Sequence, residues 1–196
     1  MIRPLLLAAL TLGVIAPLPA VADTLPANIT QQLPRGFGVL TFAEAANVSG
    51  RTYYVVALAS SREALRKHHS DPAPSRPLLI YKRAPDGRFA LVGRNDEVIL
   101  TADDGGQCDP FEPGHIAVKG AYFTVENEVA CGDHWTDYVT FRFDPAVNDY
   151  VFDSVRSESW SMNPSTDPNA EALISNGNKI TRPKLHEKVP FARWKR

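Results

Sequence analysis

Short apolar runs separated by turn residues repeat along most of the chain. Many are rich in aromatic and β-branched side chains, and the run at 138–143 alternates apolar and polar residues with the period of a strand. Runs of this length and composition are typical of strands. The pattern therefore predicts a mostly β protein. Its expected strands lie at 37–42, 53–59, 78–81, 89–92, 98–100, 116–118, 122–125, 138–143 and 150–155, with 157–162 as a further pairing segment.

Two hairpins are the clearest local signals. Their strands and turns are 78–81 with 89–92 around Pro85-Asp86-Gly87, and 116–118 with 122–125 around Lys119-Gly120. Glycine suits such turns because it accepts a positive φ. Successive hairpins at about 10-residue spacing predict an all-β antiparallel meander, either a sandwich or a propeller-like stack of small sheets.

Few segments depart from the strand pattern. Residues 23–36 contain Pro and Asn and are expected to form a loose lead-in, whereas 62–69 is the one stretch that predicts a short helix, capped by Ser60 or Ser61. A helical turn is expected around 170–174. The basic segment 181–196 has two interpretations, a solvated cationic tail or a last strand. Because it carries Val189, Phe191 and Trp194, we expect a last strand that docks on the body.

The first 22 residues have the three-part pattern of a secretory signal peptide. Arg3 precedes an apolar run at 5–15, and Ala20-Val21-Ala22 forms an A-x-A cleavage site before Asp23. A transmembrane anchor or a buried helix is the alternative, but the run is shorter than the about 20 residues that span a bilayer. We expect residues 1–22 to be removed, leaving 23–196 as a single β-rich domain, periplasmic or secreted, without a membrane span. A formal net charge of −1 argues against a nucleic-acid partner.

Cys108 and Cys131 are the only cysteines. An even pair in a secreted protein predicts a disulfide. Metal ligation with His115 or His134 is the alternative, but two cysteines without a Cys-x-x-Cys pair make a poor zinc signature.

No residue pattern selects a metal, a cofactor or a catalytic group. The acidic stretch 103–109 lacks the alternation of a calcium loop and is expected to be a solvated turn. His134, beside Asp133 and near Glu126 and Glu128, has the chemistry of a general base, but a surface histidine is the simpler interpretation. No Gly-x-Ser-x-Gly motif frames a serine nucleophile. We therefore expect a protein that is not an enzyme.

The segment 127–138 is the candidate site for a protein partner. We expect a loop between two strands, restrained by Cys131, that presents Trp135 as an anchor within a polar surround. The alternative is that Trp135 packs inward and the loop merely closes a sheet. Like Trp160 and Trp194, Trp135 also has the chemistry to stack on a sugar ring. The expected contact residues are Asp133, His134, Trp135, Asp137 and Tyr138.

Motifs across most of the chain resemble a family of secreted or periplasmic bacterial β proteins. They lie at 76–81, 90–96, 105–106, 109–111, 116–119, 123–126, Trp135, 140–143 and 189–191. Before the first long strand, members typically carry the acidic loop found in calcium-binding, propeller-like repeats. The corresponding residues 44–53 keep Asn47 and Gly50, but Ala45, Ser49 and Tyr53 replace the carboxylates. We therefore expect no calcium there, because Ca²⁺ needs several oxygen ligands.

The resemblance also implies a function. The family includes a periplasmic immunity protein of plant-pathogenic bacteria that inhibits a lysozyme-like effector. The expectation is a periplasmic binding or inhibitor protein, with a peptidoglycan hydrolase as the candidate partner. The alternatives are a cell-envelope hydrolase or carbohydrate-binding protein that uses the His134 loop, and a structural envelope protein.

Overall fold

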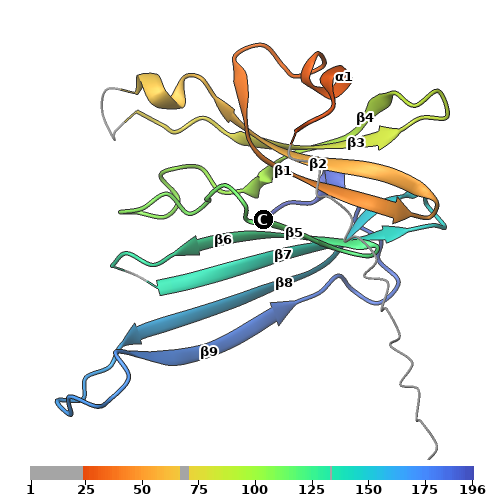
Figure 1. Cartoon of the computed structure of the whole chain (residues 1–196). Coiled ribbons are helices and arrows are strands. Elements are labelled where there is room, and N and C mark those ends of the chain that lie inside the picture. Colours follow the sequence, from red (N-terminus) through yellow and green to blue (C-terminus); the bar gives the residue numbers. More distant parts are fainter. Residues whose placement is uncertain (1–23, 67–70, 133) are drawn as a thin grey trace, which may run out of the picture.

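The computed structural model describes residues 24–66, 71–132 and 134–196, and its strands form two antiparallel sheets (Figure 1). Within each sheet the order of strands in space is their order along the chain, so both sheets are meanders. The predicted all-β antiparallel meander is confirmed. The first sheet consists of β1 (Phe37–Val48), β2 (Arg51–Ser60), β3 (Arg76–Arg83) and β4 (Phe89–Ile99), and the second of β5 (Ile116–Lys119), β6 (Tyr122–Val129), β7 (His134–Asp144), β8 (Asp149–Met162) and β9 (Leu173–Thr181).

Both predicted hairpins form at the expected turns. Between β3 and β4, the N–H of Ala84 donates to the carbonyl of Arg88 at 2.7 Å, and Gly87 has a φ of 83°. Between β5 and β6, Lys119 pairs with Tyr122 around Gly120, which has a φ of 58°. Glycine accepts these left-handed conformations because it has no Cβ.

The two sheets face each other across one apolar core, as in a sandwich. Tyr53 from the first sheet meets Phe143 and Tyr150 from the second, with ring centroids 5.5 Å apart in both pairs. Phe123 and Phe141, on neighbouring strands of the second sheet, stack at 5.1 Å. Aromatic side chains therefore supply much of the buried area between the sheets.

A short helix, α1 (Ala27–Thr30), covers the outer face of the first sheet, so the prediction of a loose lead-in at 23–36 is wrong. The segment carries Leu25, Ile29 and Leu33 at a spacing of four residues, with Ile29 inside α1 and the two leucines on either side of it. Ile29 is fully buried in a cluster with residues of β2 and β3, and Leu25 and Leu33 pack around it.

The predicted helix at 62–69 is wrong in extent. The chain forms a 3₁₀ turn at Glu63–Leu65 and is extended by Arg66, while residues 67–70 lie outside the described residues. Leu65 is 73% exposed, so no apolar face holds a longer helix against the sheet. Glu63 instead accepts hydrogen bonds from the buried guanidinium of Arg76.

The last third of the chain differs from the prediction in two places. The expected helical turn around 170–174 is instead a turn at 168–170 followed by β9. The expected last strand is a 3₁₀ turn, Phe191–Arg193, linked to β8 by a single bridge between Val151 and Pro190. The expected docking is confirmed, because Phe191 and Trp194 are buried in the shared core.

The segment 44–53, where no calcium site was expected, is the hairpin between β1 and β2. Its turn lies at Ser49 and Gly50, while Ala45, Val48 and Tyr53 are buried in the core. The acidic stretch 103–109 is a turn, as predicted. Its carboxylates bind the chain itself: Asp104 accepts from the N–H of Thr101, and Asp109 accepts from Arg76.

Candidate functional site

The segment 127–138 consists mainly of paired strands, so the predicted loop is wrong in extent. β6 continues to Val129 and β7 begins at His134, which leaves a short connection at 130–133 that contains Cys131. The reason is the alternation of β6, in which Phe123, Val125, Asn127 and Val129 are all buried. Asn127 and Val129 hold β6 against the core beyond residue 125, where the predicted strand ends.

The strand period divides the predicted contact residues between two faces of the second sheet. Side chains along β7 alternate, and its pairing with β6 runs without a register shift. Trp135 and Asp137 therefore lie on the core-facing side with Val139, whereas His134 and Tyr138 lie on the outer side. Asp133 lies outside the described residues. The structure brings Trp135 and Asp137 together, and it separates both from His134.

Trp135 and Asp137 line an open hollow of about 380 Å³ on the inner face of the second sheet. In the β7–β8 register, Trp135 pairs with Ser159 and Asp137 with Ser157. The lower strands of this sheet project beyond the first sheet, which leaves their inner face uncovered (Figure 1). The other lining residues are Ser157, Glu158 and Ser159 of β8 and Asn176, Gly177, Asn178 and Lys179 of β9.

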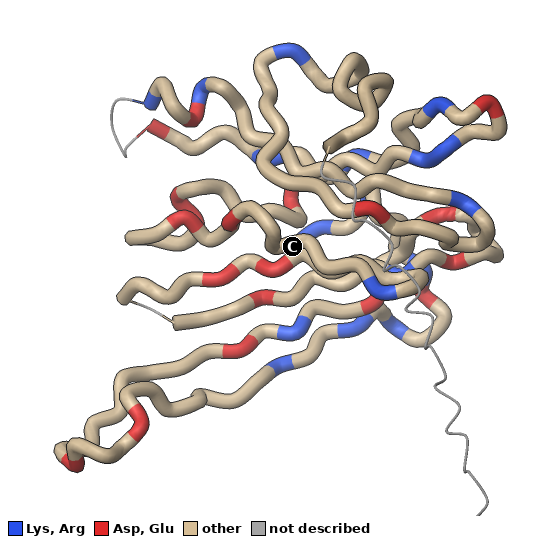
Figure 2. Tube along the Cα trace, in the orientation of Figure 1, with Lys and Arg blue, Asp and Glu red and all other residues tan. Residues whose placement is uncertain are grey.

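Arg196 binds Asp137 at the border of this hollow. Its Nη1 lies 2.6 Å from Oδ2 of Asp137, its Nη2 lies 3.4 Å from the carbonyl oxygen of Val98, and its guanidinium lies 5.9 Å from the ring centroid of Trp194. The neighbouring Lys195 pairs with Glu97. Figure 2 shows that both basic and acidic residues lie near the C-terminal end of the chain. Two consecutive basic residues, Lys195 and Arg196, thus form ion pairs with Glu97 and Asp137 beside the hollow.

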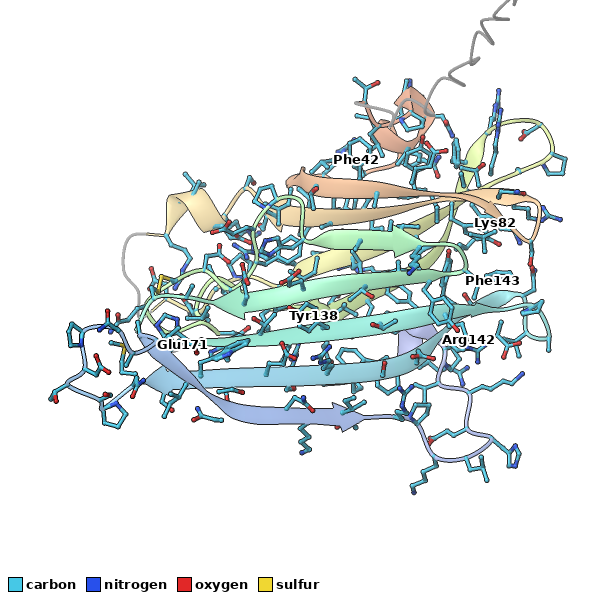
Figure 3. All side chains as sticks on the ribbon, turned by 60° about the horizontal axis from the view of Figure 1, so that its bottom comes forward. Phe42, Lys82, Tyr138, Arg142, Phe143 and Glu171 are labelled. Carbon is cyan, nitrogen blue, oxygen red and sulfur yellow. A yellow bond between two sulfur atoms is a disulfide. The ribbon has the colours of Figure 1, made fainter. Side chains whose placement is uncertain are left out.

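The outer face of the same sheet carries a second group of polar residues. Tyr138 is paired across the sheet with Glu126 of β6 and lies near Glu158 of β8. Partial burial raises the pKa of its phenol, and the negative charges of Glu126 and Glu158 raise it further. Figure 3 labels Tyr138 and Arg142, which belong to this outer row of β7. His134 pairs with Trp160.

The general-base arrangement considered for His134 would have to use this outer face. Among the described residues, His115 contacts a carboxylate there, with its Nε2 3.7 Å from Oε1 of Glu128. Within 24–66, 71–132 and 134–196, no group of three His, Cys, Asp or Glu side chains is placed to hold a metal ion. In the same ranges, no helix has the length and apolar character needed to cross a bilayer.

The predicted disulfide between Cys108 and Cys131 is confirmed. Their Cα atoms lie 6.2 Å apart, and the bond ties the β6–β7 connection to the long segment between β4 and β5. Asp109, which follows Cys108 in the chain, binds the side chain of Arg76, which is only 3% exposed; Oδ1 of Asp109 lies 2.6 Å from Nη1 of Arg76. Burial opposes the charge of Asp109, but hydrogen bonds from Arg76 and from the Phe111 N–H hold its pKa below the usual range. The start of β7 is therefore fixed to the first sheet.

Sequence reasoning missed seven of the nine residues that line the hollow. Ser157 and Ser159 come from a stretch predicted only as a further pairing segment, Lys179 comes from β9, which was not predicted, and Arg196 reaches Asp137 across 59 positions of sequence. The one available signal was the alternation along β7, which would have separated Trp135 and Asp137 from His134 and Tyr138.

Comparison of the chain with known family models, with curated proteins and with solved structures gives no match.

Proposed function

We propose that this chain is a periplasmic binding protein that holds a protein partner against the inner face of β7, β8 and β9. We further propose that the partner is a peptidoglycan hydrolase, which binding inhibits. The observation that carries the proposal is the hollow in which Trp135 and Asp137 lie together, uncovered by the first sheet. The secretory pattern of residues 1–22 and the family resemblance of the sequence supply the compartment and the class of partner.

The hollow has the chemistry of a protein-binding surface. Interfaces derive much of their affinity from a few aromatic and charged residues that lie in pockets and are surrounded by polar contacts. Here the half-buried Trp135 is the aromatic group, Asp137 is the charge, and serine and asparagine side chains form the surround. All come from paired strands, so little conformational entropy is lost when they bind.

The disulfide supports the same proposal. The connection between β6 and β7 begins the strand that carries Trp135, and its Cys131 is tied to Cys108. Asn127 reinforces this end of the sheet, because its amide bonds the carbonyl of Val98 at 3.1 Å and the N–H of Leu100 at 2.9 Å. The site is thus held in one geometry before a partner arrives.

The test is capture followed by inhibition. The immobilised protein, incubated with envelope extract of its own producer, should retain a peptidoglycan hydrolase, and the purified protein should inhibit that enzyme's cleavage of cell-wall sacculi at a one-to-one ratio. Retention of an envelope protein with no hydrolase activity would contradict the proposed class of partner. An unaffected cleavage rate at saturating protein would contradict inhibition.

A further inference from the structure

We propose that the Asp137 end of the hollow is a guanidinium-binding site, that Arg196 occupies it in the free protein, and that an arginine side chain of the partner takes its place on binding. The role of the partner rests on the proposed function above. The existence of the site and its present occupant do not, because they follow from contacts within the chain.

Three kinds of group converge on the guanidinium of Arg196. Asp137 supplies a carboxylate oxygen at 2.6 Å, Val98 supplies a carbonyl oxygen at 3.4 Å, and Trp194 supplies an aromatic face at 5.9 Å. A planar, always charged group with several N–H donors suits this combination, because a guanidinium pairs with carboxylates and also stacks on aromatic rings. The arrangement is therefore selective for arginine over a neutral group.

The occupant is exchangeable, whereas the site around it is fixed. Trp194 is 5% exposed and packed in the core, and Val98 is fully buried, so the aromatic face and the carbonyl do not depend on Arg196. The side chain of Arg196 is 31% exposed and that of Asp137 is 20% exposed. Rotation about the side-chain bonds of Arg196 is enough to vacate Asp137 without unfolding a strand.

Asp137 also faces the open hollow, and this connects the site to a partner. An arginine entering from the hollow would meet Asp137 with Trp135 two residues away on the same face of β7. Lys179 also lines the hollow, but it lies two strands from Asp137, about 10 Å away at normal strand spacing. At that distance physiological salt screens much of the repulsion between Lys179 and an arginine bound at Asp137.

The test uses a small probe, N-acetyl-arginine amide, titrated into the purified protein and followed by NMR at the Trp135 indole. In the wild-type protein the probe has to displace Arg196 from Asp137, and an ion pair at the surface opposes this only weakly. Arg196→Ala should therefore bind the probe about fivefold more tightly than wild type. Asp137→Asn in the same background should abolish the gain. Lys195→Ala is the matched control, because Lys195 pairs with Glu97, and it should bind as wild type does. Should Arg196→Ala fail to fold, Arg196→Gln replaces it.

Three results would overturn the proposal: no gain in the folded Arg196 variant, equal binding of the neutral isostere N-acetyl-citrulline amide, or a shift of the Trp135 signal by chitin tetraose but not by the arginine probe. The last would assign the hollow to sugars. Because the probe is not the partner, these failures are distinct from a failure to capture a hydrolase.

Discussion

The side-chain amide of Asn127, on β6, donates to the carbonyl oxygen of Val98, on β4, at 3.1 Å in the interior of the protein. Its carbonyl oxygen accepts from the N–H of Leu100 at 2.9 Å. One fully buried side chain therefore joins the two sheets beside the strand that carries Trp135.

Replacing Asn127 should destabilise the fold substantially. Asn127→Ala removes the hydrogen bond to the Val98 carbonyl, which keeps only the longer contact from Arg196, and leaves the Leu100 N–H without this partner, so the free energy of unfolding should fall by about 2–3 kcal/mol. Urea denaturation measures the change. Asn178→Ala, which removes an exposed amide on β9, is the control and should change stability by less than about 0.5 kcal/mol. Equal stability of both variants would show that Asn127 does not join the sheets.

Closure of the Cys108–Cys131 bridge should also stabilise the protein. Cys108→Ser and Cys131→Ser should each lower the free energy of unfolding by about 2–5 kcal/mol, and the double variant by about the same amount, since all three remove one bond. A double variant much less stable than either single variant would assign the loss to packing rather than to the bond. Two alkylatable thiols in the folded wild-type protein would refute the pairing.

Most strands were readable from the sequence because they depend on local alternation, and both hairpins depend on glycines within four-residue turns. β9, which is exposed along almost its whole length, was not predicted. α1 was missed although Leu25, Ile29 and Leu33 have helical spacing, because one turn flanked by proline gives a weak pattern. The 3₁₀ turn at Phe191–Arg193 was taken for a strand. It is fixed by Asn95, whose amide donates to the carbonyls of Phe191 at 2.7 Å and Trp194 at 2.9 Å, and no local pattern encodes such contacts.

The candidate site was predicted in part. Trp135 and Asp137 were identified by their chemistry, but grouping them with His134 and Tyr138 required a loop. In a strand, neighbouring side chains point to opposite faces. The remaining lining residues depend on the register between β8 and β9, which has a bulge between Glu158 and Trp160. A bulge changes the pairing without a clear signature in the sequence.

The contact between Gly93 and Phe191 predicts a steric effect. A Cβ added at Gly93 would lie 2.9 Å from Cδ1 of Phe191, so Gly93→Ala should displace the 3₁₀ turn and lower the free energy of unfolding by about 1–3 kcal/mol. Gly38→Ala on β1 is the matched control, because nothing lies within 4 Å of the added carbon. Thermal melting compares the two. A Gly93 variant as stable as the Gly38 variant would show that Phe191 does not pack on this strand.

Acid should weaken the protein partly through Asp109. Hydrogen bonds from Arg76 and Phe111 hold the folded-state pKa of this carboxyl below that of an unfolded aspartate, about 3.9. The ionised form therefore stabilises the fold above that pH, and this stability is lost as the pH falls through the folded-state pKa. Asp109→Asn should flatten the decline of stability below about pH 4. Asp167→Asn, at an exposed position, is the control. An unchanged decline in the Asp109 variant would contradict the pairing with Arg76.

The inner face of the second sheet is the proposed binding face, and the matched pair Trp135 and Trp160 tests it. Both are half-buried and lie on neighbouring strands, but Trp135 lies on the inner face, whereas Trp160 pairs with His134 on the outer face. Affinity for the captured hydrolase is measured with Trp135→Ala, Trp160→Ala and Ser159→Arg, each checked by melting for a folded state. Trp135→Ala and Ser159→Arg should weaken binding about tenfold or more, and Trp160→Ala should bind as wild type does. Native affinity in both inner-face variants, or a loss confined to Trp160→Ala, would contradict the proposed binding face.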